Sequence, residues 1–183
     1  MRVALFGGSF DPPHMAHVQC VAVALASGEV DHVLVVPCFQ HVLGKESTPY
    51  VHRVEMVKQA LQIFGHLVEF SDIEEQLGGP SRTLDTLQAL IAQRPSTSWR
   101  LLIGTDILAE KEQWYRFDEV ARLAPPLIVG RQGWDAPADT DFALPAISSR
   151  TIRNRIQAGK NLGHLVPAAV WHYIQKEGLY GTK

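Results

Sequence analysis

Short apolar runs alternate with segments of helical periodicity along the whole chain. Near-continuous apolar runs predict buried strands at residues 2–6, 33–36, 67–70, 99–103 and 126–129, with a further short one at 142–144. Apolar residues spaced by three and four predict helices at residues 14–26, 52–64, 83–93, 118–123, 149–158 and 167–176. Alternating strands and helices favour an α/β fold, a Rossmann-like doubly wound parallel sheet, with the last two helices as a small C-terminal helical portion.

The carboxyl ends of these strands are where such a sheet binds its ligands. Glycines or prolines stand at four of the predicted ends, namely Gly7–Gly8, Pro37, Gly104 and Gly130. We therefore expect these positions to line one crevice. Residues 39–50 and 131–141 are predicted to be long loops, and in a compact domain long loops are often functional.

Length and composition narrow the class of protein. The 183 residues fit one domain over residues 1–183, with a sizeable core. The formal net charge of −2 provides no basic field for nucleic acid, and no apolar run of about 18 residues predicts a membrane span. The chain enters a strand at once, without a signal-peptide pattern, and its two cysteines, Cys20 and Cys38, are too few for a disulfide framework. We expect a cytoplasmic protein with reduced thiols.

Residues 7–17, Gly-Gly-Ser-Phe-Asp-Pro-Pro-His-Met-Ala-His, carry the strongest chemical signal. Glycine allows a close backbone approach to a ligand, and the N-terminus of the following helix suits phosphate. His14 and His17, three residues apart, would share one helix face. Either feature alone has an ordinary structural explanation, but together at a strand-to-helix junction they indicate a nucleoside triphosphate site. The segment is neither a P-loop nor a Gly-x-Gly-x-x-Gly fingerprint.

A second candidate phosphate site lies at the start of the helix predicted at residues 149–158. Ser148 and Ser149 precede it, so one of them should cap it. The free N–H groups of the helix start and Arg153, about one turn on, could then bind the same anion. The alternative is a plain capped helix with a solvated arginine.

Four stretches together resemble a known family. Residues 7–17 resemble the GxFDPxHxxH signature of the nucleotidyltransferase superfamily related to class I aminoacyl-tRNA synthetases, specifically the nicotinate or nicotinamide mononucleotide adenylyltransferases. Residues 81–87 (SRTLDTL) resemble that family's (S/Y)-x-T-x-D-T-L helix start. Residues 103–106 (IGTD) with Trp114, and residues 147–153 (ISSRTIR), resemble two more of its motifs, and Glu-Gly-Leu-Tyr at 177–180 is a typical ending. The resemblance covers essentially the whole chain.

The resemblance implies transfer of AMP from ATP to nicotinate mononucleotide, or to its nicotinamide form, with release of pyrophosphate, in NAD biosynthesis. The 5′-phosphate of the acceptor would attack the α-phosphorus directly, so catalysis would consist of positioning and charge stabilisation. Mg²⁺ would arrive on the ATP phosphates, and no cluster of carboxylates predicts a metal site held by the protein. A homo-oligomer is left open.

The resemblance also implies roles for single residues. The expected catalytic residues are His14, His17, Arg153 and Lys45. The expected ATP-binding residues are Gly7, Gly8, Ser9, Phe10, His17, Gly104, Asp106, Arg131, Ser148, Ser149 and Arg153. The expected mononucleotide-binding residues are Asp11, Lys45, Thr83, Asp85 and Trp114. Each has a structural alternative: Thr83 and Asp85 can simply begin a helix, Asp106 can cap one, Trp114 can pack, and Arg131 can be solvated.

The chain departs from the family pattern at two places. His41-Val42-Leu43-Gly44-Lys45 stands where the family commonly has P-P-H-K/R, and Ala16 stands where glycine usually precedes the second histidine. The first departure leaves room for another acceptor or for a non-catalytic nucleotide-binding module. Phosphopantetheine adenylyltransferases usually have threonine at the position that His14 occupies here. Cytidylyltransferases usually have R-T-x-G at the start of the motif that residues 147–153 resemble, and this chain lacks it. Both families therefore fit less well. A nucleic-acid-binding fragment is disfavoured because there is no basic patch.

Overall fold

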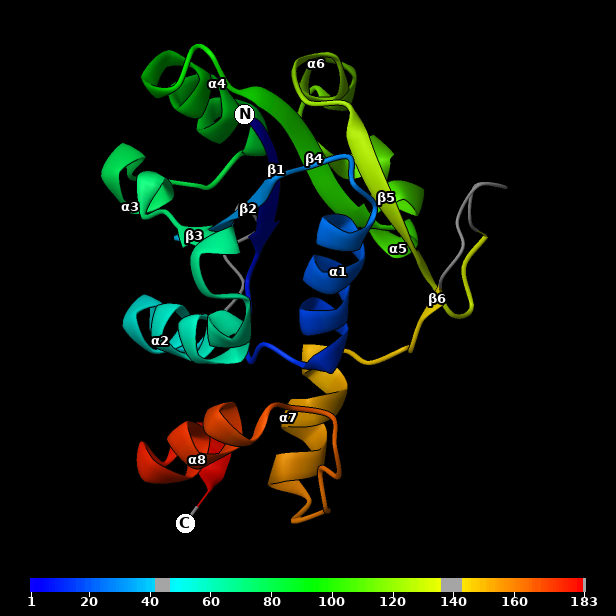
Figure 1. Ribbon diagram of the computed structural model, residues 1–183. Helices are drawn as coiled ribbons and strands as arrows, with labels where there is room; N and C mark the ends of the chain where they lie inside the picture. Colours follow the sequence, from blue (N-terminus) through cyan, green and yellow to red (C-terminus); the bar gives the residue numbers. More distant parts are fainter. Residues whose placement is uncertain (42–46, 136–142, 183) are drawn as a thin grey trace.

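A six-stranded parallel sheet of order β3-β2-β1-β4-β5-β6 forms the centre of the protein (Figure 1). The computed structural model describes residues 1–41, 47–135 and 143–182. The strands are β1 (Arg2–Gly8), β2 (His32–Pro37), β3 (Val68–Phe70), β4 (Ser98–Gly104), β5 (Pro126–Arg131) and β6 (Ala143–Leu144). β1 occupies the middle of the sheet, which explains its apolar sequence, because a central parallel strand is covered on both faces.

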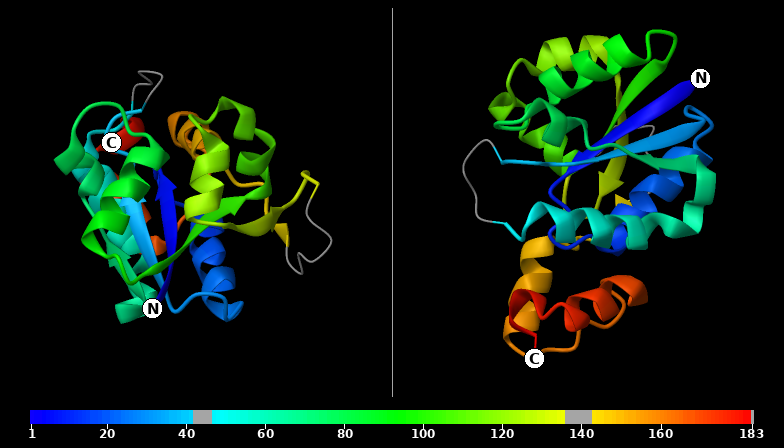
Figure 2. Two further views of the ribbon diagram at one scale, coloured as in Figure 1. Left: turned by 90° about the horizontal axis from the view of Figure 1, so that it is seen from above. Right: turned by 90° about the vertical axis from the view of Figure 1, so that its left-hand side faces the viewer.

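Helices cover both faces of this sheet, as Figure 2 shows. They are α1 (Met15–Ala26), α2 (Tyr50–Leu61), α3 (Ile73–Leu77), α4 (Thr83–Gln93), α5 (Thr105–Ala109), α6 (Phe117–Leu123), α7 (Ser149–Gln157) and α8 (Ala168–Lys176), with 3₁₀ turns at Gln62–Leu67, Lys111–Gln113 and Leu179–Gly181. α7 and α8, drawn in orange and red, lie beyond the carboxyl ends of the central strands (Figure 1). The doubly wound fold and its C-terminal helical portion are therefore as predicted.

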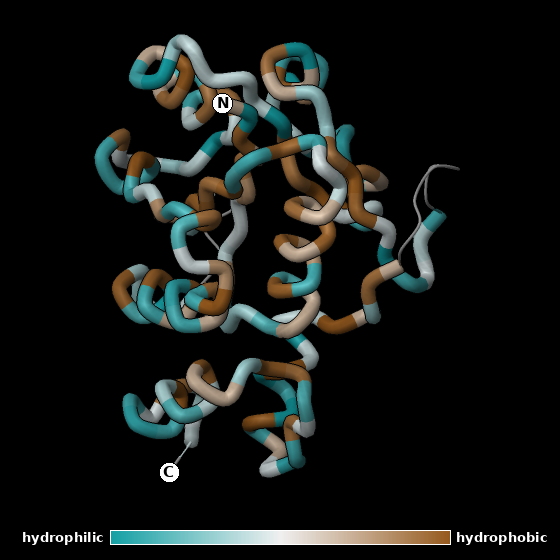
Figure 3. The backbone as a smooth tube through the Cα atoms, viewed as in Figure 1, coloured by the Kyte–Doolittle hydropathy of each residue, from teal (hydrophilic) through white to brown (hydrophobic). Residues whose placement is uncertain are grey.

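Two apolar cores result from the period-two alternation of the strands. Ala4 and Phe6 of β1 face a core shared with α1, α2, α7 and α8, whereas Val3 and Leu5 face a core shared with α3, α4 and α6. The central strands are accordingly drawn mostly in hydrophobic colours, while the helices alternate along their length (Figure 3). No helix in the described part of the chain is long and apolar enough to cross a membrane.

The boundaries differ from the predictions at a few places. α1 begins at Met15, so His14 is its N-cap rather than a helical residue. α2 begins two residues before the predicted 52 and ends at Leu61, where a 3₁₀ turn follows. α3 and α5 were not predicted, because five residues are too few for an apolar periodicity to show. Position 142 of the last predicted strand lies outside the described residues.

Candidate active site

The predicted crevice lies where the order of the strands reverses, between β1 and β4. The carboxyl ends of four strands meet at this edge, at Gly8, Pro37, Gly104 and Arg131. Gly130, predicted to follow β5, is inside that strand. An open α/β sheet binds ligands at such a switch point. The structure therefore supports the expected placement of the glycine-bearing loops.

The turn after β1 is held by the ring of Phe10. Phe10 adopts a left-handed φ of 49°, which is uncommon for a residue other than glycine, and only 2% of its surface is exposed. Its ring packs edge-to-face on Phe6 and His17, with centroid distances of 5.5 and 5.1 Å. A Cβ on Gly8 would approach this ring to 3.0 Å, so any other residue there would require the Phe10 ring to shift.

His14 and His17 form a stacked pair at the start of α1. Their ring centroids are 3.8 Å apart and their planes 25° from parallel, although His14 precedes the helix. The backbone N–H of His14 donates to Nδ1 of His17 at 3.0 Å. Because Nδ1 accepts this bond, neutral His17 carries its proton on Nε2. His17 is thereby set to present an N–H donor.

Burial keeps both imidazoles neutral at pH 7. Desolvation, with a contribution from the Arg131 charge, lowers the pKa of His14 to about 3. The pKa of His17 is also lowered well below its ordinary value, by desolvation first and then by His14 and Arg131. Nδ1 of His14 is buried and has no hydrogen-bond partner among the described residues. A buried polar atom without a partner is uncommon, and here it marks a place where a ligand can complete the site.

These lowered pKa values predict a pH-dependent stability. A histidine of the unfolded chain has a pKa near 6.5, whereas the pKa of His14 in the folded protein is about 3. Between these two pH values the unfolded chain therefore binds a proton that the folded protein does not. The contribution of His14 to the free energy of unfolding is therefore fully present above pH 6.5 and is lost as the pH decreases. Between pH 6 and 5, His14→Asn should reduce the slope of the unfolding free energy by about 1.4 kcal/mol per pH unit. Urea unfolding at these pH values measures it, with His164→Asn, at an exposed position, as the control for replacing a histidine outside the site.

Arg131 joins two loops of the expected ATP side. Its guanidinium forms an ion pair with Asp106 and donates to the backbone carbonyl of Ile147. Its backbone N–H donates to Thr105 Oγ1 at 3.0 Å. A side chain on Gly104 would collide with the Asp106 carboxylate, so glycine permits this pair to form. Gly104, Asp106 and Arg131 therefore lie together, as the sequence predicts, and Arg131 is not a solvated arginine.

The start of α7 docks on the segment that carries the histidines. Ser148 caps the helix, its Oγ accepting from the Thr151 N–H at 3.2 Å. Ser149 Oγ donates to the Pro12 carbonyl at 2.9 Å, and the Arg153 guanidinium donates to the Asp11 carbonyl. The capping prediction is confirmed. The two candidate phosphate segments, far apart in sequence, are in contact.

Asp11 connects four segments rather than pointing freely into the crevice. Its carboxylate accepts hydrogen bonds from Tyr180 Oη at 2.7 Å and from the Thr48 N–H at 3.4 Å. It also lies 3.7 Å from the Arg153 guanidinium, and only 6% of Asp11 is exposed. Its assignment as a mononucleotide ligand stays a prediction, but the structure gives this carboxylate internal partners.

The other expected mononucleotide residues lie on the α4 side of the sheet. Thr83 and Asp85 form the first turn of α4, and the Arg82 guanidinium before them lies 4.5 Å above the Tyr115 ring. This contact brings the helix start beside the segment that carries Trp114. Lys45 lies outside the described residues.

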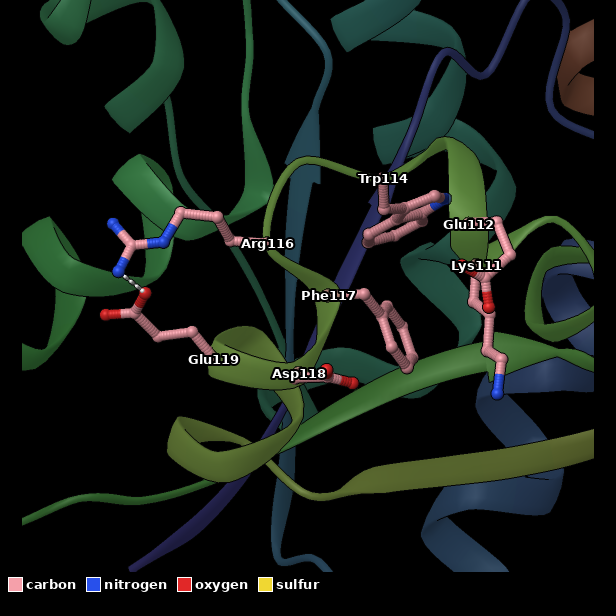
Figure 4. Close-up of a pocket in the computed structure, with 7 residues that line it drawn as sticks. All are labelled: Lys111, Glu112, Trp114, Arg116, Phe117, Asp118 and Glu119. Atoms are coloured by element: carbon pink, nitrogen blue, oxygen red, sulfur yellow. Dashed lines mark ion pairs between the residues drawn. The ribbon is translucent and has the colours of Figure 1, made fainter.

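Trp114 lines a hollow of about 420 Å³ between the 3₁₀ turn Lys111–Gln113 and α6. In Figure 4 its ring lies next to that of Phe117, whereas Arg116 turns away toward Glu119. The two rings pack edge-to-face with centroids 5.8 Å apart. Both the packing alternative and an accessible ring surface are therefore compatible with this position. No described contact joins Trp114 to the histidines.

Two buried charged residues were not predicted. Arg53 of α2 is 2% exposed and donates to three backbone carbonyls. Glu74 of α3 is 9% exposed and accepts from Phe39 N–H and Thr86 Oγ1 at 3.0 and 3.1 Å. A signal for Arg53 existed, since it precedes the buried Met56 and Val57 by three and four residues and so lies on the apolar stripe.

Comparison with known proteins agrees with this geometry. The family model described as cytidylyltransferase-like matches residues 5–155. The chain is 36% identical over 183 residues to the probable nicotinate-nucleotide adenylyltransferase of Myxococcus xanthus, covering 100% of this chain and 96% of that protein. It is 40% identical over 181 residues to the corresponding protein of Anaeromyxobacter sp. (strain K), covering 98% and 96%.

Solved structures support the fold. Nicotinic acid mononucleotide adenylyltransferase of Plasmodium falciparum complexed with NaAD superimposes with a TM-score of 0.83, at 18% identity, over 100% of this chain and 98% of that one. The same enzyme complexed with APC gives a TM-score of 0.81 at 17% identity, covering 100% and 98%. With relatives of more than 30% identity along nearly its full length, the chain belongs to the nicotinate-nucleotide adenylyltransferase family of cytidylyltransferase-like proteins.

Proposed function

We propose that this protein transfers AMP from ATP to nicotinate mononucleotide, releasing pyrophosphate and forming the dinucleotide for NAD biosynthesis, as a single nucleotidyltransferase domain over residues 1–183. The observation that carries the proposal is the stacked, neutral His14–His17 pair at the start of α1. Arg131 lies close enough to lower both histidine pKa values, and the start of α7 with Arg153 docks on the same segment. A polyphosphate needs such a set of N–H donors and cations.

The reaction requires no covalent intermediate on the protein. An oxygen of the acceptor 5′-phosphate forms a bond to the α-phosphorus of ATP, and the bond from that phosphorus to the bridging oxygen of pyrophosphate breaks. His17 donates its Nε2–H to a phosphate oxygen on which charge develops, and the N-terminus of α1 adds its positive dipole end. Arg131 and Arg153 hold the anion in place, so that catalysis consists of positioning and electrostatic stabilisation.

The remaining residues divide between the two substrates. Gly7 and Gly8 at the end of β1, with Ser9 and Phe10 in the turn that follows, lie beneath the triphosphate. The ATP side is completed by Gly104, Asp106, Ser148 and Ser149. Thr83, Asp85 and Trp114 form the mononucleotide side, with Lys45 and Asp11 assigned to it from the motif alone.

We also propose that Mg²⁺ enters on the ATP phosphates and neutralises part of their charge. The donor set fits a metal carried by the substrate. The Asp11 and Asp106 carboxylates are both engaged by arginines, and no group of three or more metal-ligating side chains gathers in the described part of the chain. A cytoplasmic location is part of the proposal, supported by the two free cysteines.

The decisive experiment measures pyrophosphate release with ATP and Mg²⁺ and compares nicotinate mononucleotide, nicotinamide mononucleotide and phosphopantetheine. We expect the largest kcat/KM with nicotinate mononucleotide, because the curated relatives are named for that acceptor. A preference for another acceptor would assign the departure at residues 41–45 to substrate choice. ATP binding without turnover of any acceptor would favour the non-catalytic nucleotide-binding module.

A further inference from the structure

The buried guanidinium of Arg53 contacts three chain segments. Its Nε donates to the Thr48 carbonyl at 2.9 Å. Its two terminal nitrogens donate to the Ser9 carbonyl at 2.9 Å and to the Phe39 carbonyl at 3.3 Å. Ser9 belongs to the turn after β1, Phe39 follows β2, and Thr48 precedes α2. The forked donors of arginine, which lysine lacks, are what allow one side chain to reach all three.

Among residues 1–41, 47–135 and 143–182, no carboxylate forms an ion pair with Arg53. A buried guanidinium such as this one is normally paired, because isolation from water is costly. Glu74, the buried carboxylate of the same region, is used instead by Phe39 N–H and Thr86 Oγ1. The guanidinium faces three backbone carbonyls and the Tyr50 ring, whose centroid lies 5.5 Å from its central carbon. The guanidinium therefore lies directly against the turn that is proposed to bind ATP.

The contacts also fix the orientation of two peptide groups. In a trans peptide the carbonyl and the following N–H point in opposite directions. Because Arg53 holds the Ser9 carbonyl, the Phe10 N–H is directed away from Arg53, and it has no acceptor among the described residues. The Phe39 carbonyl is held in the same way, and the Gln40 N–H opposite it donates to Ser81 Oγ at 3.2 Å. Both peptides are thus oriented by the one side chain.

These two segments belong to different substrates in the proposed reaction. The turn at Ser9 is on the ATP side, whereas Phe39 and Gln40 are tied through Ser81 to the start of α4 on the mononucleotide side. A direct link between the segments exists as well, from Cys38 N–H to the Gly8 carbonyl at 2.9 Å. Arg53 therefore fixes the ATP side and the mononucleotide side of the site relative to one another.

We infer that Arg53 is a positioning residue for adenylyl transfer: its guanidinium fork sets the ATP-binding turn after β1 at a fixed distance from the segment after β2, so that the acceptor phosphate meets the α-phosphorus. The inference rests on the proposed function. It predicts that replacing Arg53 lowers the rate of the chemical step and leaves the affinity for each substrate nearly unchanged. Each side of the site stays intact, but the distance between the two sides is no longer fixed.

Arg53→Lys tests this, with Arg100→Lys as the matched control. Arg100 also donates to two backbone carbonyls, of Pro125 and Pro126, at 2.9 and 3.0 Å. It differs in pairing with Glu29, and it lies in the amino-terminal half of β4, away from the proposed site. We expect R53K to lower kcat about 10- to 100-fold. Its dissociation constant for ATP, measured by calorimetry, should stay within about threefold of wild type. R100K should keep kcat within about twofold at a comparable midpoint of urea unfolding.

The outcomes are distinguishable. If wild type turns over and R53K retains its kcat, or loses it only in proportion to the fraction folded, Arg53 is merely structural and the inference is wrong. If wild type turns over no acceptor, the proposed function fails first and the inference with it. Should R53K not fold, Arg53→Gln, which keeps an N–H donor without the charge, is measured by the same split between kcat and the ATP dissociation constant.

Discussion

Replacing His17 with alanine is expected to lower kcat for pyrophosphate release by about 10²–10³-fold, the usual cost of removing one preorganised donor to a developing negative charge. The Nε2–H of His17 is the donor lost. The substitution also removes the acceptor of the His14 N–H and a ring that stacks on His14 and packs edge-to-face on Phe10. We therefore expect a destabilisation of about 2–3 kcal/mol as well. Steady-state kinetics and urea unfolding of the same preparation separate the two effects.

A pair of isosteric variants tests the tautomer on which this prediction depends. Glutamine places an amide N–H near the position of Nε2, whereas asparagine reaches only as far as Nδ1. His17→Gln should therefore retain more activity than His17→Asn, and His17→Asn should retain more stability. Equal activity of the two variants would contradict the assignment of the proton to Nε2. Exposed His172→Ala controls for the loss of an imidazole outside the site.

The fold could be predicted because its strands are buried on both faces. The apolar runs at β1 and β2 leave no helical alternative of useful length, and α4 was predicted with its observed bounds, Thr83–Gln93, from its apolar periodicity and the proline that follows. α3 and α5 could not be predicted. Each is a single short turn whose formation depends on tertiary contacts, such as the burial of Ile73 and of Thr105, rather than on local pattern.

The motifs that form the site could be predicted from the sequence, but the hydrogen bonds and ion pairs that connect them could not. The motifs correctly bring His14, His17 and the start of α7 together, because each lies at the carboxyl edge of the sheet. Sequence patterns carry no information about which side chains pair across long separations: Asp11 and Tyr180 are 169 residues apart, and Arg53 and Ser9 are 44 apart. The tautomer of His17 likewise follows only from a backbone N–H whose direction is set by the helix cap.

Asp11→Ala is expected to lower the free energy of unfolding by about 2–4 kcal/mol, a large effect for one residue of the turn. The substitution leaves Tyr180 Oη and the Thr48 N–H without their acceptor, and it removes the carboxylate that lies 3.7 Å from Arg153. Burial raises the pKa of Tyr180, with further contributions from Asp11, so its hydroxyl stays a donor. Asp11→Asn keeps an acceptor and the shape of the side chain, and should cost about half as much. Urea unfolding of both variants measures the difference.

A double-mutant cycle between Asp11→Asn and Tyr180→Phe decides what this carboxylate does. If Asp11 serves mainly to hold the C-terminal turn, the two substitutions should couple by about 1 kcal/mol in stability, and their effects on kcat should not add. If it is instead a ligand of the mononucleotide, Asp11→Asn should raise KM for that substrate alone, and Tyr180→Phe should leave KM unchanged. The 2.7 Å bond from Tyr180 and the burial of Asp11 favour the first result, because a carboxylate already surrounded by three partners has little capacity left for a substrate.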